Sequence, residues 1–393
     1  MNPTLVILLV GSSVAASCAL VGTFLVLRKM ALLGDAISHA VLPGIALAFL
    51  LTGSRNPLPM VIGATALGVL TVLLVELANR TQLLKPDASI GVVFPALFSI
   101  GVILISRFAY NVDLDLDCVL HGEIAYAPWD PLLFDLGSRT LDLGPRALWI
   151  NGAVLVLNLL FVGFFYKELK LSTFDGALAM SLGFSPVLLH YLLMTMVSVT
   201  VVGAFESVGA ILVVAMLIVP PATAKLLTVR LSRMLGLSVV LGISSAVLGY
   251  GLAHWWDASI AGAMATVAGL QFMLALGFAP QTGLLARWLR HRKLETAMTE
   301  QLLLLHLHDE QAPAARSPLE IRRRFGWAEG RLARVVDRLE RRHWVVRSIA
   351  GDEGAADGAR PDGGDNQATV DLRVTEAGLH HLEKTGHLPL RHA

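Results

Sequence analysis

Apolar segments long enough to cross a bilayer follow one another along the first 280 residues of the chain. A transmembrane helix needs about 20 mostly apolar residues, and nine segments approach that length. They occur at residues 4–27, 36–53, 57–75, 88–106, 147–166, 187–205, 207–224, 234–253 and 258–279. The gaps at 28–36 and 205–207 are short enough to hide broken helices, so we expect eight to ten spans. The pattern predicts an all-α polytopic membrane domain.

The pattern changes after about residue 285, where shorter elements alternate with polar loops. The expected order is helices Thr299–Asp309, Pro318–Phe325 and Glu329–Trp344, strands Val345–Ile349 and Val370–Val374, and helix Glu376–Lys384. Three helices followed by a two-stranded wing predict a small α+β winged-helix domain. We therefore expect a transmembrane domain at residues 1–285 and a winged-helix-like domain at residues 286–393.

The composition supports this division. The 393 residues are 55% hydrophobic and 16% charged, which is typical of a polytopic membrane protein. Residues 1–280 hold 27 charged side chains, whereas the 113 residues after them hold 34. Lys and Arg are also uneven among the connecting loops: if the C-terminal domain is cytoplasmic, nine lie in inner loops and four in outer loops. Cytoplasmic loops are enriched in Lys and Arg, so this orientation is favoured.

Asp35 and His39 stand four residues apart at the head of the second apolar segment. This spacing places both side chains on one helix face, one turn apart. A carboxylate in a bilayer is costly, and it usually faces a protein interior or an aqueous cavity. Oxygen and neutral imidazole together suit Mn, Fe or Zn better than Ca or Mg. The pair is therefore a candidate metal site. The alternative is a helix N-terminus that Asp35 caps, with His39 merely packed.

Glu206 and His190 are weaker metal candidates. Glu206 lies between two apolar segments, where it is either a carboxylate of the ion pathway or an outer-interface residue at the turn. His190, early in the sixth segment, is either a ligand or a packed, hydrogen-bonded histidine.

The loop from Arg107 to Arg146 carries seven acidic residues and three arginines. Such a net negative charge at a pore mouth would attract cations or a basic partner surface. Its Asp-Leu alternation lacks the central glycine and the final glutamate of a calcium loop, so we favour a docking edge over a metal site. The docking residues are Asp113, Asp115, Asp117 and Glu123.

The chain contains no G-x-x-x-x-G-K-[ST] motif, so it has no P-loop to hold ATP phosphates. No nucleophile-elbow or metalloprotease motif is present either. We therefore expect a transport subunit that is not an enzyme. If ATP drives the transport, a partner subunit hydrolyses it.

Four groups of residues, in this order over residues 1 to about 285, resemble the membrane permeases of metal-type ABC importers, which carry zinc, manganese or ferrous iron. They are Arg28–Gly44 (RKMALLGDAISHAVLPG), Val112–Asp115 with Leu120–Ile124, Lys167–Lys170 with Phe174, Asp175 and Ala179–Gly183, and Ser207–Ala224 (SVGAILVVAMLIVPPATA). Ala210–Ile218, within the last of these groups, and the later stretch Phe278–Gly283 resemble the manganese/iron branch more than the zinc branch.

The resemblance implies a type II ABC importer-like permease in a bacterial cell (inner) membrane. The implied partners are a second permease subunit, of the same or a sister chain, a cytoplasmic ABC ATPase dimer and an extracytoplasmic metal-binding protein. It implies that Asp35 and His39 coordinate the transported ion, with no permanently bound cofactor. It also implies that a short amphipathic helix, with Phe174, Asp175 and Ala179 and a final Gly183, couples the permease to the ATPase. The alternative for that segment is a solvated connecting turn.

Two other functions stay open. An ion-coupled secondary metal transporter would need no ATPase. A membrane-tethered metal-responsive regulator would use the C-terminal domain, whose order of elements resembles the DNA-binding domain of metal-responsive repressors. Its third helix is rich in arginine, but acidic residues dilute the charge, so we favour a regulatory or protein-contact role over nucleic acid binding.

Overall fold

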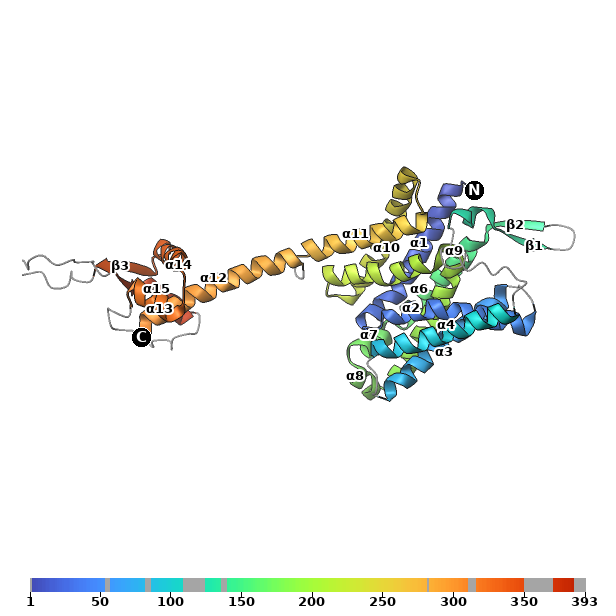
Figure 1. The fold of residues 1–393 in the computed structure, drawn as a ribbon, viewed down its shortest axis with the longest axis horizontal. Coiled ribbons are helices and arrows are strands. Elements are labelled where there is room, and N and C mark those ends of the chain that lie inside the picture. The colour runs from blue at the N-terminus through green and yellow to red at the C-terminus, as the bar shows by residue number, and fades with distance from the viewer. Residues whose placement is uncertain are drawn as a thin grey trace, which may run out of the picture. The chain divides into compact units, whose positions relative to one another are not determined.

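The structure is a computed structural model that describes residues 2–53, 57–81, 86–108, 124–135, 140–280, 283–309, 316–349 and 370–384. The chain forms two compact units, Met1–Leu285 and Ala286–Ala393. The first unit is a bundle of long helices, and the second is a smaller unit of helices and one hairpin (Figure 1).

Within the described residues, eight helices are long and apolar enough to cross a membrane. They are α1 (Pro3–Leu27), α2 (Leu32–Thr52), α3 (Pro57–Arg80), α4 (Pro86–Phe108), α6 (Arg146–Phe164), α9 (Pro186–Leu227), α10 (Leu231–Trp256) and α11 (Ile260–Phe278). Each predicted apolar segment coincides with one of these helices to within two residues at the ends where it extends beyond the helix. The sixth and seventh segments lie together in α9.

Helix α9 is broken at Gly209. Its 42 residues would measure about 63 Å as a straight helix, twice the thickness of the hydrocarbon core. Gly209 has φ 77° and ψ 164°, a conformation that glycine adopts without the steric cost of a Cβ. The break predicted near residues 205–207 therefore exists, and it lies at the nearest glycine on the C-terminal side.

The neighbours of α9 show that its first half runs antiparallel to α6. Asn158 Nδ2 donates to Thr200 Oγ1 at 2.8 Å, and Asn151 Nδ2 donates to Ser207 Oγ at 2.9 Å. The later residue of α6 thus pairs with the earlier residue of α9, as it does when two helices run antiparallel. The first half reaches Ser207 at the end of the bundle where α6 begins. We call this the η1 end, because the 3₁₀ helix η1 (Ile124–Trp129) lies there.

The second half of α9 returns to the opposite end. Helix α1 starts near η1, since a Cβ on Gly11 would lie 3.5 Å from the Ile124 side chain. Farther along α1, a Cβ on Gly22 would lie 1.9 Å from the backbone oxygen of Leu217. The second half of α9 therefore runs beside α1, away from the η1 end. With the two halves of α9 taken separately, the eight described helices correspond to the nine apolar segments that the pattern predicts.

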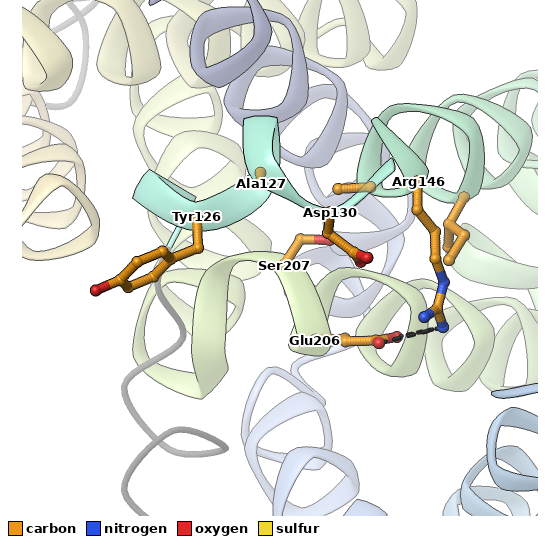
Figure 2. A pocket seen from close by; sticks show the side chains of 8 residues that line it. Tyr126, Ala127, Asp130, Arg146, Glu206 and Ser207 are labelled. Atoms are coloured by element: carbon orange, nitrogen blue, oxygen red, sulfur yellow. Dashed lines mark hydrogen bonds and ion pairs between the residues drawn. The ribbon is translucent and has the colours of Figure 1, made fainter. Parts of the chain in front are cut away.

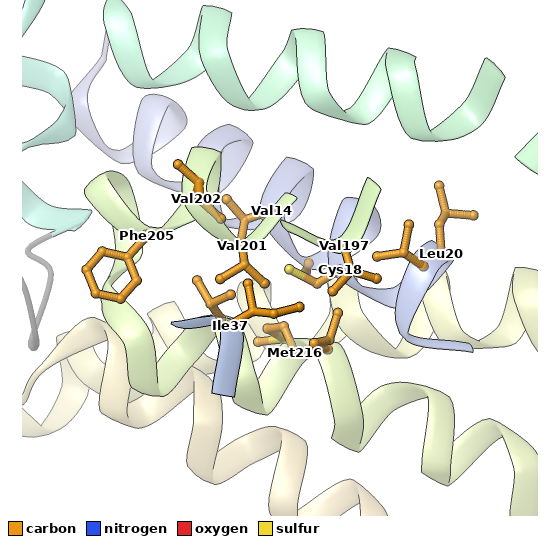
Figure 3. Packing of buried hydrophobic residues seen from close by; sticks show 14 of the residues in the cluster. Val14, Cys18, Leu20, Ile37, Val197, Val201, Val202, Phe205 and Met216 are labelled. Carbon is orange, nitrogen blue, oxygen red and sulfur yellow. The ribbon is translucent and has the colours of Figure 1, made fainter. Parts of the chain in front are cut away.

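The core of the first unit gathers around α1. Cys18 in α1 and Ile37 in α2 are fully buried between side chains of both halves of α9, including Val197, Val201 and Met216 (Figure 3). Small residues let the backbones approach closely, as at Gly22 against Leu217. Such close contacts replace the hydrophobic driving force that lipid cannot supply between membrane helices.

Two short helices connect α6 to α9 at the end opposite η1, which we call the α7 end. They are α7 (Tyr166–Phe174) and α8 (Gly176–Ser181). At the η1 end, β1 (Pro131–Asp135) and β2 (Thr140–Pro145) form an antiparallel hairpin. Arg28, at the end of α1, contacts α7, so α1 joins the two ends.

The second unit contains all but the first two residues of α12 (Leu284–Asp309), together with α13 (Pro318–Phe325), α14 (Glu329–Arg341), β3 (Val345–Ile349), β4 (Val370–Val374) and α15 (Glu376–Lys384). The strands pair antiparallel, from Val345 opposite Val374 to Ile349 opposite Val370. The order of elements matches the prediction, but α12 begins well before Thr299 and α14 ends before Trp344. A buried aliphatic cluster joins the helices to the hairpin.

Candidate functional site

Asp35 lies in the first turn of α2, at the α7 end of the bundle. The residue that caps α2 is Ala31, and no side chain accepts a hydrogen bond there. The alternative in which Asp35 is the N-cap is therefore wrong. The Asp35 carboxylate instead faces the next turn, where its Oδ1 lies 3.6 Å from Nε2 of His39. The predicted pair thus forms, and its side chains are 43% and 31% exposed.

His39 is held against α4 by two aromatic rings. Its imidazole stacks on Phe94, with centroids 5.2 Å apart, and meets the edge of Phe98 at 5.8 Å. These phenylalanines are four residues apart in α4, so both lie on the face towards α2. The packing orients the ring and leaves Nε2 directed at the Asp35 carboxylate.

Pro43 and several glycines fix α2 one turn beyond His39. Because Pro43 has no amide hydrogen, the carbonyl of His39 loses its normal partner within the helix. A Cβ on Gly101 of α4 would lie within 2.8 to 2.9 Å of Pro43 atoms, and a Cβ on Gly44 would lie 2.5 Å from Ala64 of α3. Helix α2 is therefore packed backbone to backbone against both neighbours.

The distance between Asp35 and His39 suits a shared transition-metal ion. With each donor about 2.1 Å from the ion, a separation of 3.6 Å corresponds to a ligand–metal–ligand angle of about 118°. Among the residues that the structure describes, no group of three His, Cys, Asp or Glu side chains could hold an ion. The pair can supply two ligands to a passing ion, and water or further groups would complete its coordination.

His190 is not close to this pair but to a cation. Its Nδ1 lies 3.5 Å from Nη1 of Arg28, and its Nε2 is buried with no hydrogen-bond partner in the described part of the chain. A guanidinium beside the ring repels a metal ion, so the structure favours the hydrogen-bonded alternative for this histidine.

Glu206 is held at the η1 end, far along α9 from His190. Its Oε1 lies 3.2 Å from Nη2 of Arg146, the first residue of α6, and its side chain is 58% exposed (Figure 2). The two residues line a cavity of about 240 Å³ together with Asp130 and Tyr126. Glu206 therefore lies three residues before the turn at Gly209, paired with an arginine and away from the Asp35–His39 pair.

The segment from Phe174 to Gly183, for which the resemblance implies a coupling role, differs in detail from the predicted helix. Helix α7 ends at Phe174. The next residue, Asp175, has an extended backbone with φ −148° and ψ 91°, which separates α7 from α8. The Asp175 carboxylate caps α8 by accepting from the Leu178 amide at 2.9 Å. Ala179 is fully buried, whereas Phe174 is 61% exposed. Gly183 has φ 86°, which confirms its place just after the helix.

The acidic docking residues Asp113, Asp115, Asp117 and Glu123 lie outside the described residues. Four side chains contact candidate residues that the sequence alone did not connect with them, namely Phe94, Phe98, Arg28 and Arg146. The four-residue spacing of the two phenylalanines was the one signal in the sequence that could have indicated that this face of α4 packs against another helix.

Comparisons with known proteins identify the class. Residues 2–279 match the ABC 3 transport family. The chain therefore belongs to this family, and it is a membrane subunit of an ABC transporter rather than an enzyme.

Individual relatives agree with this assignment. The manganese transport system membrane protein MntD of Bacillus subtilis is 50% identical over 284 residues, which cover 72% of this chain and 95% of that protein. The zinc transport system membrane protein TroD of Treponema pallidum is 44% identical over 348 residues, covering 88% of this chain and 94% of that protein. Since this match is longer than the first unit, it includes part of the second.

A solved structure resembles the bundle as well. The complex of PsaBC from Streptococcus pneumoniae with Fab contains a chain that is 32% identical to this one, with a TM-score of 0.60. The match covers 74% of this chain and 96% of that chain.

Proposed function

We propose that this chain is the permease of an ATP-driven importer for divalent transition metal ions, and that the ion passes the Asp35–His39 pair by alternating access. The observation that carries this proposal is the pair itself. A carboxylate oxygen and an imidazole nitrogen lie 3.6 Å apart on a helix that is long and apolar enough to cross a membrane. This donor set suits Mn, Fe or Zn.

The relatives support a metal as cargo. MntD is named for manganese and TroD for zinc, and a third relative, 33% identical, is a probable iron transport system membrane protein of Haemophilus influenzae. Resemblance to the manganese/iron branch and the 50% identity with MntD favour manganese or iron for this chain.

The charges of the loops support a cytoplasmic α7 end. Lys167, Lys170, Arg28 and Lys29 all lie at that end, as does the turn after α9 with Arg230. Because cytoplasmic loops are enriched in Lys and Arg, the N-terminus would lie outside and the C-terminal unit would be cytoplasmic.

The exposed side chains of α7 and α8 support a coupling role. Phe174, Leu178 and Met180 are 61%, 45% and 63% exposed at an end that would face water. An apolar surface in that position favours a partner over a solvated turn. We assign it to the cytoplasmic ABC ATPase dimer. A second permease subunit and an extracytoplasmic metal-binding protein would complete the importer.

The second unit supports a regulatory or protein-contact role. Several arginines of its helices are already paired, as Arg342 is with the buried Glu300 at 3.0 Å and Arg341 is with Asp337 at 3.0 Å. Pairing of this kind lowers the charge available to phosphates. Its three helices followed by a hairpin support a winged-helix fold, which we propose for this unit.

The test is transport by the purified complex in proteoliposomes, with manganese, iron and zinc offered together. The importer should take up a metal only when its ATPase and ATP are present. Uptake by the permease alone, driven by an ion gradient, would instead identify a secondary transporter. A chain truncated after residue 285 that still takes up metal would argue against a regulator as the main function.

A further inference from the structure

The guanidinium of Arg28 joins three elements at the α7 end. Its Nη2 donates to Ser172 Oγ at 2.8 Å, and its Nε donates to Thr173 Oγ1 at 3.2 Å. Its Nη1 lies 3.5 Å from Nδ1 of His190. Ser172 and Thr173 directly precede Phe174 at the end of α7, and His190 lies near the start of α9. One side chain thus contacts the segments on both sides of α8.

The backbone of Arg28 is fixed to the start of α2. Arg28 caps α1, the following residue Lys29 is left-handed with φ 60°, and the Met30 amide donates to the Leu25 carbonyl at 2.9 Å. This bond pattern is a Schellman motif, which ends α1 sharply. Helix α2 begins at Leu32, two residues later, and carries Asp35 in its first turn.

Close packing makes this turn a stiff connection. A Cβ on Gly34 would lie 2.2 Å from Cδ2 of Leu217, so the first turn of α2 has no free space against the second half of α9. A displacement of Arg28 would therefore shift the start of α2, and the pair of Asp35 and His39 with it, instead of being absorbed by the turn.

The partners of Arg28 suit a contact that rearranges. The Arg28 guanidinium is partly buried, and this burial lowers its pKa. In the described residues no ion pair joins Arg28 to a carboxylate, so its acceptors are the two hydroxyls and the imidazole. Hydrogen bonds to neutral groups position a partly buried arginine, yet they can be exchanged at lower cost than a buried ion pair.

We propose that Arg28 is a positioning residue that transmits movement of the α7–α8 segment to the first turn of α2, and so controls the position of Asp35. This inference rests on the proposed function, because it needs α7 and α8 to receive movement from the ATPase. Arg28 does not contact the transported ion. Its role is to make the position of the ion-binding pair depend on the state of the coupling segment.

The test compares metal uptake with ATP hydrolysis in proteoliposomes that contain the complete complex. Arg28→Met keeps an unbranched, flexible side chain but removes the guanidinium and all its donors. We expect the metal transported per ATP to fall about tenfold, as the loss of hydrogen bonds from a charged group predicts, while the ATPase still co-purifies. Arg28→Lys should restore part of the ratio, since an ammonium is a point charge without the guanidinium fork.

A second variant removes the acceptors and keeps the arginine. Ser172→Ala combined with Thr173→Val should lower the same ratio, and adding Arg28→Met to it should change little more, because all act on one contact. Arg80→Met is the matched control. Arg80 is also at the α7 end, but its side chain is 63% exposed and pairs only with Glu76 in the described residues.

Three results would overturn the inference. One is an unchanged ratio of uptake to hydrolysis in Arg28→Met. Another is a normal ratio in the Ser172/Thr173 variant. The third is parallel loss of assembly, hydrolysis and uptake in Arg28→Met that Arg28→Lys does not relieve, which would identify a merely structural role. A wild-type complex without ATP-dependent metal uptake would overturn the proposed function, and this inference with it.

Discussion

Replacing Phe174 by aspartate tests the proposed contact with the ATPase. Phe174 is 61% exposed in this subunit, at the end of α7. Full burial of a phenylalanine side chain contributes about 1.5–3 kcal/mol, so covering the exposed part would contribute about 1–2 kcal/mol to association. A carboxylate placed in the same apolar contact would add a desolvation cost of several kcal/mol unless it found a partner.

The sum is at least about 3 kcal/mol, which corresponds to a weakening of association of more than about 100-fold. The variant should therefore lose co-purification of the ATPase, and hydrolysis stimulated by the metal-binding protein should fall with it. Binding of the metal to the permease should remain, because Phe174 contacts neither Asp35 nor His39 in the described structure.

Val229→Asp is the matched control. Val229 is 87% exposed and lies between α9 and α10 at the same end of the bundle, so it places the same charge outside α7 and α8. Normal co-purification and normal stimulated hydrolysis in Phe174→Asp would refute the reasoning, and residues 167–185 would be a linker.

Two further predictions concern the ion site and the bundle. His39→Ala should lose selectivity among manganese, iron and zinc more than it loses assembly, because imidazole is the softer donor of the pair; competition assays that give unchanged preferences would contradict this. Gly22→Ala should lower the free energy of unfolding of the purified protein by about 1–3 kcal/mol or prevent folding, because the new Cβ would lie 1.9 Å from the backbone oxygen of Leu217. Gly152→Ala, which meets no atom within 4 Å, should be harmless, and equal melting temperatures for the two variants would show that the α1–α9 contact is not tight.

The spans were predictable because lipid imposes a simple requirement. Each crossing needs a long apolar segment with its backbone hydrogen bonds satisfied inside the helix. The turn within α9 was predictable for the same reason, but its position was not. It lies at Gly209, where a positive φ is allowed, and not at the polar Glu206 that interrupts the hydropathy.

The amphipathic pattern of the sequence predicted the elements of the second unit but not the ends of all of them. The predicted helix Thr299–Asp309 is the part of α12 that contributes Leu303, Leu304 and Leu307 to the core. The preceding turns of α12 are mostly exposed, so no apolar stripe marks them. Hydrophobic periodicity detects burial, and an exposed helical turn gives no such signal.

The candidate site was predictable only where it is local in sequence. Asp35 and His39 are one helical turn apart, so their contact follows from the helix alone. The rings of Phe94 and Phe98 that orient His39 come from α4. Likewise, Arg28 meets Ser172 across 144 residues. Contacts of this kind depend on how helices pack, which one sequence does not reveal.

The most direct test of the account is the uptake of radiolabelled manganese, iron or zinc by proteoliposomes that contain the complete complex with Asp35→Ala. We predict ATP-dependent uptake by the wild-type complex. With Asp35→Ala, uptake should fall to the level seen without ATP while the ATPase still co-purifies, because the carboxylate supplies the only formal negative charge at the head of α2. Wild-type uptake by Asp35→Ala would contradict the central claim that the ion passes this pair.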